Sequence, residues 1–180
     1  MRINFYALRA IYFHEMDRFR RTLIQSLLSP VLSTSLYFIV FGSVIGDYVQ
    51  KIDGISYGSY IVPGLLMLTL LTQSISNTSF GIFFPKFNGT IYEILAAPIS
   101  TVEIVIAYVG AGATKTLIVA AVIFCTSLFF AEVNVKFPLL MIFLLILVAF
   151  TFALFGFLIG LLSKNFEQMS IIPTIVITPM

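Results

Sequence analysis

Long apolar runs separated by short polar segments dominate the pattern of the chain. The runs cover residues 23–45, 60–83, 104–130, 138–162 and 171–180. A transmembrane helix needs about 20 mainly apolar residues, and the first four runs supply that length. The pattern predicts an all-α polytopic membrane protein, organised as one domain over residues 1–180, with four full transmembrane helices and the start of a fifth.

The last run, 171–180, is much shorter than the others. Its ten residues would cover about 15 Å as a helix, whereas the hydrocarbon core of a bilayer is about 30 Å thick. A helix ending there would leave its last carbonyl groups without partners inside the membrane. This favours the interpretation that the sequence is a fragment of a longer protein.

Residues 2–21 precede the first span and combine apolar with charged positions at helical spacing. The apolar positions are Phe5, Leu8, Ile11, Tyr12, Met16 and Phe19. The charged positions, which lie largely on other faces, are Arg9, Asp17, Arg18, Arg20 and Arg21. We expect an amphipathic helix that lies along the membrane surface. The alternative is an ordinary juxtamembrane helix packed on the side of the bundle.

The longest polar interruption runs from Phe84 to Glu103 and carries clear helix boundary signals. Thr90 with Glu93, and Ser100 with Glu103, both fit the capping-box pattern. Pro98 lies between the two boxes, where a proline ends one helix before the next begins. The segment is predicted to form a short helix over residues 90–97, a break at Pro98 and a new helix that enters the membrane near Ser100.

Ile91, Ile94 and Leu95 recur at i, i+3 and i+4 in the short helix, so they are predicted to share one face. An apolar face on a short helix between two spans needs a surface to pack against. Two interpretations stay open at this point. The helix docks on a partner protein, or it is a reverse turn that packs on its own bundle.

Two further patterns within the spans concern contacts between helices. Thr69, Thr72, Gln73 and Ser76 form a polar stripe along the second span. Such groups are costly when they face lipid, so the stripe is either a packing face or part of a transport pathway, and packing is favoured. Gly156 and Gly160 form a small-xxx-small pattern in the fourth span, which favours close helix packing.

Charge content and charge placement agree with a membrane protein. Only 10% of the residues are charged, compared with about 25% in soluble domains. One side of the predicted membrane topology holds Arg2, Arg9, Arg18, Arg20, Arg21, Lys86 and Lys164, whereas the other holds Lys51 and Lys136. By the positive-inside rule, the N-terminus and the 84–103 segment are predicted to be cytoplasmic.

The sequence offers little that could form a catalytic or metal site. His14 is the only histidine and Cys125 the only cysteine, so neither a metal cluster nor a histidine-based triad is expected. Acidic residues lie at the ends of spans and in loops, which argues against a proton carrier built on buried carboxylates. Lys115 is ionisable and lies within an apolar run. It is expected to snorkel to the cytoplasmic interface, although a functional role is the alternative.

The 110–116 segment is superficially similar to a phosphate-binding loop, but Thr114 and Val109 occupy the positions where that motif requires glycine. No nucleotide, cofactor, catalytic or metal site is therefore predicted, and nucleic acid is not an expected partner. A membrane-embedded enzyme is the least favoured class of function.

The layout resembles the ABC-2 type permease family, the membrane subunits of a class of ATP-driven exporters. The resemblance is carried by Gly-Thr-x-x-Glu-x-Leu-x-x-Pro-x-Ser over residues 89–100. It is also carried by Phe-x-x-Phe-Gly at 38–42 and by Ile-Val-Pro-Gly at 61–64. The family has six spans, whereas this sequence stops in the fifth.

The resemblance implies that Thr90, Ile91, Glu93, Ile94 and Leu95 belong to a coupling helix, which a separate cytoplasmic ATP-binding subunit would grip. It further implies a permease homodimer in the bacterial inner membrane, with membrane lipid around it. The implied activity is the outward movement of a lipid-linked glycan, a polysaccharide or an amphipathic drug by alternating access. The alternative function is a non-transporting scaffold that anchors a cytoplasmic protein, and ATP-dependent flux would distinguish the two.

Overall fold

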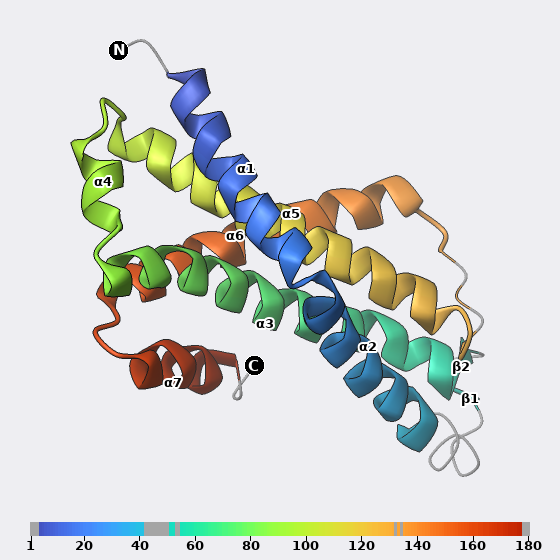
Figure 1. Ribbon diagram of the computed structural model, residues 1–180. Coiled ribbons are helices and arrows are strands. Elements are labelled where there is room, and N and C mark those ends of the chain that lie inside the picture. Colours follow the sequence, from blue (N-terminus) through green and yellow to red (C-terminus); the bar gives the residue numbers. More distant parts are fainter. Residues whose placement is uncertain (1–3, 42–50, 53–54, 132, 134, 178–180) are drawn as a thin grey trace.

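The fold is a helical bundle with one short hairpin, and the computed structural model describes residues 4–41, 51–52, 55–131, 133 and 135–177 (Figure 1). Its helices are α1 (Phe5–Arg21), α2 (Leu23–Ile39), α3 (Tyr57–Asn88), α4 (Ile91–Ala96), α5 (Thr101–Ser127), α6 (Pro138–Leu162) and α7 (Phe166–Ile177). Two-residue strands β1 (Lys51–Ile52) and β2 (Ile55–Ser56) pair antiparallel within a segment that the sequence suggested was only a polar loop.

Three helices of the described part, α3, α5 and α6, are long and apolar enough to cross a membrane. They correspond to the predicted spans at 60–83, 104–130 and 138–162. Helices α1 and α2 together would make a further, broken span, because they meet at a bend of 65°. The predicted first span, 23–45, lies partly outside the described residues, which include α2 as far as Ile39 and continue to residue 41.

Helix boundaries around the polar interruption differ from those expected. Helix α3 continues to Asn88, five residues beyond the end of the span predicted at residue 83. Pro85 lies inside the helix, which ends where Gly89 adopts a left-handed conformation with φ of 80°. This conformation is one that glycine adopts without strain. The expected backward extension of the third span to Ser100 is confirmed, because α5 begins at Thr101.

Helix α7 begins at Phe166 rather than at Ile171. The Phe166 ring makes edge-to-face contacts with the rings of Phe83 and Phe87, each with centroids 4.9 Å apart. These aromatic contacts fix the start of α7 against the end of α3. The polar residues at 167–168 therefore form the first turn of the helix instead of a loop before it.

Small residues allow α3 and α6 to pack closely. Ala149, Ala153, Gly156 and Gly160 recur along α6 at i, i+4, i+7 and i+11, and all four are buried. A Cβ atom on Gly160 would lie 2.5 Å from the Ser79 carbonyl oxygen. Ser74 of α3 donates a hydrogen bond of 3.0 Å to the Ala149 carbonyl oxygen. Close backbone approach and an interhelical hydrogen bond are the features by which helices associate in lipid.

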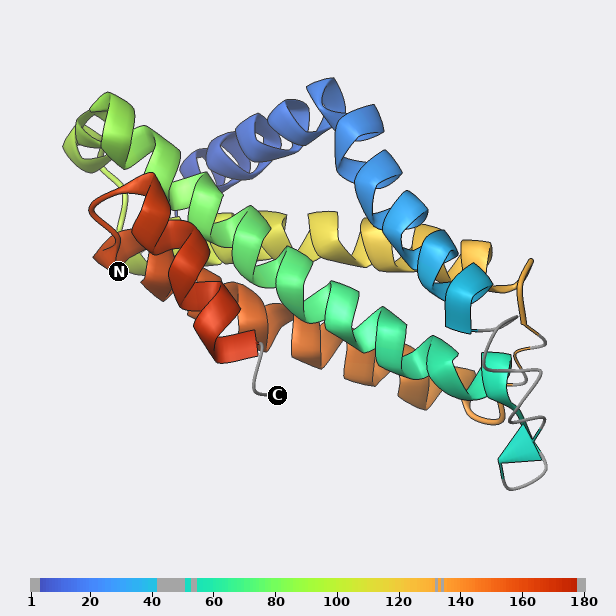
Figure 2. The same cartoon turned by 90° about the horizontal axis from the view of Figure 1, so that it is seen from below.

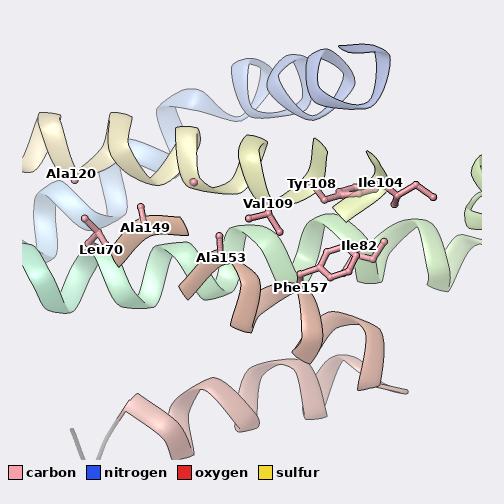
Figure 3. Close-up of a cluster of buried hydrophobic side chains, with 10 residues drawn as sticks. Leu70, Ile82, Ile104, Tyr108, Val109, Ala120, Ala149, Ala153 and Phe157 are labelled. Carbon is pink, nitrogen blue, oxygen red and sulfur yellow. The ribbon is translucent and has the colours of Figure 1, made fainter. Parts of the chain in front are cut away.

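The core lies where α3, α5 and α6 meet, as Figure 3 shows. Its buried residues are Leu70, Ile82, Ile104, Tyr108, Val109, Ala113, Ala120, Ala149, Ala153 and Phe157. Alanine predominates where backbones approach, and the larger Tyr108 and Phe157 rings fill the space nearer the α4 end, with centroids 6.3 Å apart. The core therefore combines close approach of the helix backbones at the alanines with aromatic rings that fill the wider space.

Helix α1 packs along the first half of α5, and α2, after the 65° bend, packs against the later part of α5 (Figures 1 and 2). Two contacts tie α1 to α5 over its length. The backbone N–H of Asn4 donates to the Glu103 carboxylate, and the Tyr12 hydroxyl donates a 3.1 Å hydrogen bond to Thr114. The N-terminal helix is thus packed on the side of the bundle, which is the alternative that the sequence left open.

Candidate functional site

Helix α4 is a short segment at one end of the bundle, between the end of α3 and the start of α5 (Figure 1). Its six residues, Ile91–Ala96, confirm that the polar interruption contains a short helix, although it is shorter than the predicted 90–97. Pro98 follows it in a non-helical stretch, as predicted. The two long helices on either side are therefore joined through a short helix.

The two sides of α4 have different surroundings. Ile91 and Ile94 are partly buried and pack against the core of the bundle. Tyr92 and Leu95 face outward, with 71% and 61% of their surface exposed, and Glu93 is exposed as well. The three apolar residues predicted to share one face are thus divided. Two anchor α4 to its own bundle, whereas Leu95 is on the free side.

The two predicted capping boxes have different outcomes. At Ser100, both bonds are present, because Glu103 N–H donates to Ser100 Oγ at 3.3 Å and Ser100 N–H donates to Glu103 Oε2 at 2.7 Å. The Thr90 box is not formed, and that prediction is wrong. Thr90 has a helical backbone conformation, and its hydroxyl lies 3.4 Å from the carbonyl oxygen of Pro85 rather than at the α4 N-terminus.

The polar stripe of the second span lies on α3 and is only partly covered. Thr69 and Thr72 donate their hydroxyls to backbone carbonyls one turn earlier, at 2.8 and 2.9 Å. Gln73 accepts a hydrogen bond of 3.4 Å from the Asn77 side chain, and Ser76 is exposed. The stripe is therefore satisfied largely within its own helix. Its outer side is left facing a hollow in the surface.

This hollow has a volume of about 750 Å³ and lies against α3 between the α1–α2 corner and α7. Its lining residues are Arg18, Phe19, Thr22, Gln25, Ser26, Thr72, Ser76, Asn77, Ser79, Phe80, Lys115, Met169, Ser170 and Thr174. Hydroxyl and amide side chains account for most of these residues by number. Among the described lining residues there are two cations and no carboxylate.

Lys115 lies in a buried ion pair, so the prediction that it snorkels to the interface is wrong. Its Nζ is 2.7 Å from Oε2 of Glu15, and both side chains are almost completely buried. The same oxygen is 2.8 Å from the Arg18 guanidinium. Lys115 is the fifteenth residue of α5, about 21 Å along the helix from its start. A carboxylate from α1 compensates the charge there, so the side chain has no need to extend to water.

Glu15 is a buried charged residue that the sequence pattern did not single out. It lies four residues after Ile11 and four before Phe19, within the apolar stripe of α1. A carboxylate in such a stripe, with an isolated lysine in an apolar span, was the available signal. Acidic residues were predicted at the ends of spans and in loops, and α1 packs one of them, Glu15, against the middle of α5.

Glycine contacts elsewhere in the bundle include both predicted packing positions. Gly156 and Gly160 lie against the backbone of α3 at Ile75 and Ser79. The described residues bring no three His, Cys, Asp or Glu side chains together in a way that could hold a metal ion.

Comparison with known proteins identifies the family. Residues 6–180 match the family described as ABC-2 type transporter. The chain is 38% identical to the inner membrane transport permease YadH of Escherichia coli K12, over 100% of this chain and 70% of that protein. The YadH proteins of Escherichia coli O157:H7 and Shigella flexneri give the same values. No solved structure gave a significant match. The chain therefore belongs to the ABC-2 type transporter family and is the permease subunit of a transporter, a multi-pass protein of the inner membrane.

Proposed function

We propose that this permease is an exporter subunit, driven by a separate ATP-binding subunit that docks on α4. The observation that carries the proposal is the division of α4 into an anchored side and a free side. Ile91 and Ile94 hold it on the bundle, whereas Tyr92 and Leu95 are left exposed at the end of the molecule. Exposed aromatic and aliphatic side chains of this kind are typical anchors at protein interfaces.

The connections of α4 suit it to transmit force into the spans. Ser100 and Glu103 fix the start of α5, and the Glu103 carboxylate also holds the N–H of Asn4 at the start of α1. A push on Leu95 would therefore act on α3, α5 and α1 together. Rigid-body movement of packed helices is the usual way in which such a push switches access between two sides of a membrane.

The finer points of the proposal come from the charge pattern and the family resemblance. The N-terminus and α4 face the cytoplasm, since most of the Lys and Arg residues lie on that side. Two copies of the permease combine with two ATP-binding subunits. The cargo is an amphipathic molecule, such as a lipid-linked glycan, a polysaccharide or an amphipathic drug, and it moves outward.

Substitution on the free side of α4 tests the docking. We expect Leu95→Asp to reduce co-purification of an ATP-binding subunit, and the ATP hydrolysis of the purified complex, by at least tenfold. Ile94→Asp is a poorer test, because Ile94 packs on the bundle and its change would also disturb the fold. Phe129→Asp is the matched control, since Phe129 is 88% exposed beyond the far end of α5. Equal loss in both variants, or none in Leu95→Asp, would contradict the proposal.

Labelling tests the orientation of α4 separately. The exposed native Cys125 is first replaced by alanine, and Glu93→Cys then gives a single thiol on α4. A membrane-impermeant maleimide should label this thiol in inside-out vesicles and leave it unlabelled in intact cells. Labelling from outside intact cells would show that the topology is inverted.

A further inference from the structure

The hollow beside α3 combines a polar wall with two cationic side chains, and its position is independent of α4. Arg18 enters it from the end of α1, and Lys115 enters it from the middle of α5. Thr72 and Ser76 of the polar stripe line the same hollow from α3. Five helices thus contribute to this surface, since α2 supplies Gln25 and Ser26, and α7 supplies residues such as Ser170.

The charges at this hollow do not balance within the described part of the chain. A single carboxylate oxygen, Oε2 of Glu15, forms ion pairs with both cations. It lies 2.8 Å from the Arg18 guanidinium and 2.7 Å from Lys115 Nζ. Glu15 does not line the hollow, whereas the partly exposed Arg18 and the almost completely buried Lys115 both do. One positive charge is therefore in excess at this partly buried site, where an unbalanced charge is costly.

Arg18 is held in place before any ligand arrives. Its guanidinium lies 5.3 Å from the centroid of the Phe80 ring, which is also part of the wall, while Glu15 fixes its other side. A cation–π contact and an ion pair together restrict the rotamers of a long side chain. The group is thus preorganised, which lowers the entropy cost of binding an anion.

We infer that this hollow binds the phosphate group of an amphipathic molecule, with Arg18 and Lys115 as its cationic contacts. A guanidinium and an ammonium group are the side chains that best bind phosphate oxygens. The hydroxyls of Thr72 and Ser76 supply neutral hydrogen-bonding groups beside them. The volume of about 750 Å³ is within the usual range for small-molecule sites and exceeds what a phosphate alone needs.

The inference deepens one part of the proposed function, because the amphipathic molecule is either a resident lipid or the cargo itself. It concerns binding only, however, and it requires neither docking on α4 nor ATP hydrolysis. A Leu95→Asp protein that has lost its ATP-binding partner should still bind the ligand. Failure of one proposal therefore leaves the other in place.

The test is a titration of the purified full chain, in neutral detergent, with dioleoyl phosphatidic acid and with zwitterionic dioleoyl phosphatidylcholine. Native mass spectrometry counts the lipid-bound fraction. We expect at least tenfold tighter binding of phosphatidic acid, and at least a tenfold loss of that binding in Arg18→Gln. This variant keeps the pair between Lys115 and Glu15, so the fold is expected to survive. Thr72→Val, which keeps the side-chain size, should weaken the binding severalfold.

Arg20→Gln is the matched control, because Arg20 is exposed on the same helix and does not line the hollow. An equal loss in Arg18→Gln and Arg20→Gln would overturn the inference, since it would indicate general surface attraction. Equal binding of the two lipids by the unaltered chain would overturn it too. Competition with inorganic phosphate identifies the source of the anion. Displacement of the lipid supports recognition of the phosphate alone, and retention of the lipid supports a lipid-borne phosphate.

Discussion

Gly156 of α6 lies directly against the backbone of Ile75 in α3. A Cβ atom built on this glycine would come within 2.5 Å of the Ile75 carbonyl oxygen and 2.8 Å of its Cα atom. Both neighbouring atoms belong to the backbone of a helix and cannot move aside alone. The contact therefore sets the distance between two of the helices that can cross the membrane, and it does so at a position where only glycine fits.

Gly156→Ala should consequently destabilise the bundle, because the added methyl group forces α3 and α6 apart. The expected cost is about 1–3 kcal/mol, the usual range for an overpacked interior. Equilibrium unfolding in mixed detergent micelles measures it. Gly64→Ala and Gly110→Ala are matched controls within α3 and α5, since no atom lies within 4 Å of a Cβ built at either glycine. A Gly156→Ala protein as stable as these controls would contradict the contact.

The two capping-box patterns show where local sequence determines structure and where it does not. Thr90 with Glu93 and Ser100 with Glu103 have the same spacing, yet only the second forms. Ser100 has an extended backbone, which lets its hydroxyl reach Glu103 N–H. Thr90 follows the left-handed Gly89 and is already helical, so its side chain cannot bend back in the same way. The difference comes from the preceding residues and not from the box.

Ser100→Ala should therefore cost about 1 kcal/mol of stability, the typical effect of losing a helix cap. Thr90→Ala should have a much smaller effect, because its hydroxyl makes no bond at the α4 N-terminus. Thermal unfolding followed by circular dichroism compares the two variants directly. Because the sequence pattern alone ranks them as equals, an equal loss of stability would show that the Thr90 box forms in solution.

Much of the fold could be predicted because lipid imposes simple rules on a chain. Apolar length located α3, α5 and α6, and Pro98, between two capping-box patterns, located the break after α4. The apolar length of a span and the break at a proline both depend on residues that are close together in the sequence. The boundaries of α3 and α7 were missed, because Gly89 and the contacts of Phe166 fix them through conformation and tertiary packing.

The buried charges could not be located in the same way. Glu15 and Lys115 are 100 residues apart, and only the packing of α1 along α5 joins them. Seen alone, Glu15 belongs to a surface helix, and Lys115 to the cytoplasmic half of a span, from which a lysine side chain can snorkel. The division of α4 into two sides had the same origin, since Ile91 and Ile94 pack on the core formed by other helices, whereas Leu95 stays exposed.

The Glu15–Lys115 pair gives a final prediction, in which the order of effects is the test. Glu15→Gln should be the most damaging change, at about 3–5 kcal/mol, because it leaves Lys115 and Arg18 close together without a carboxylate. Lys115→Met should cost less, since Glu15 keeps its 2.8 Å contact with Arg18. The double variant Glu15→Gln with Lys115→Met should recover much of the loss, because it removes both buried charges. Unfolding in mixed micelles measures all three. If Lys115→Met proves the more damaging single change, Arg18 does not share the carboxylate as the geometry indicates.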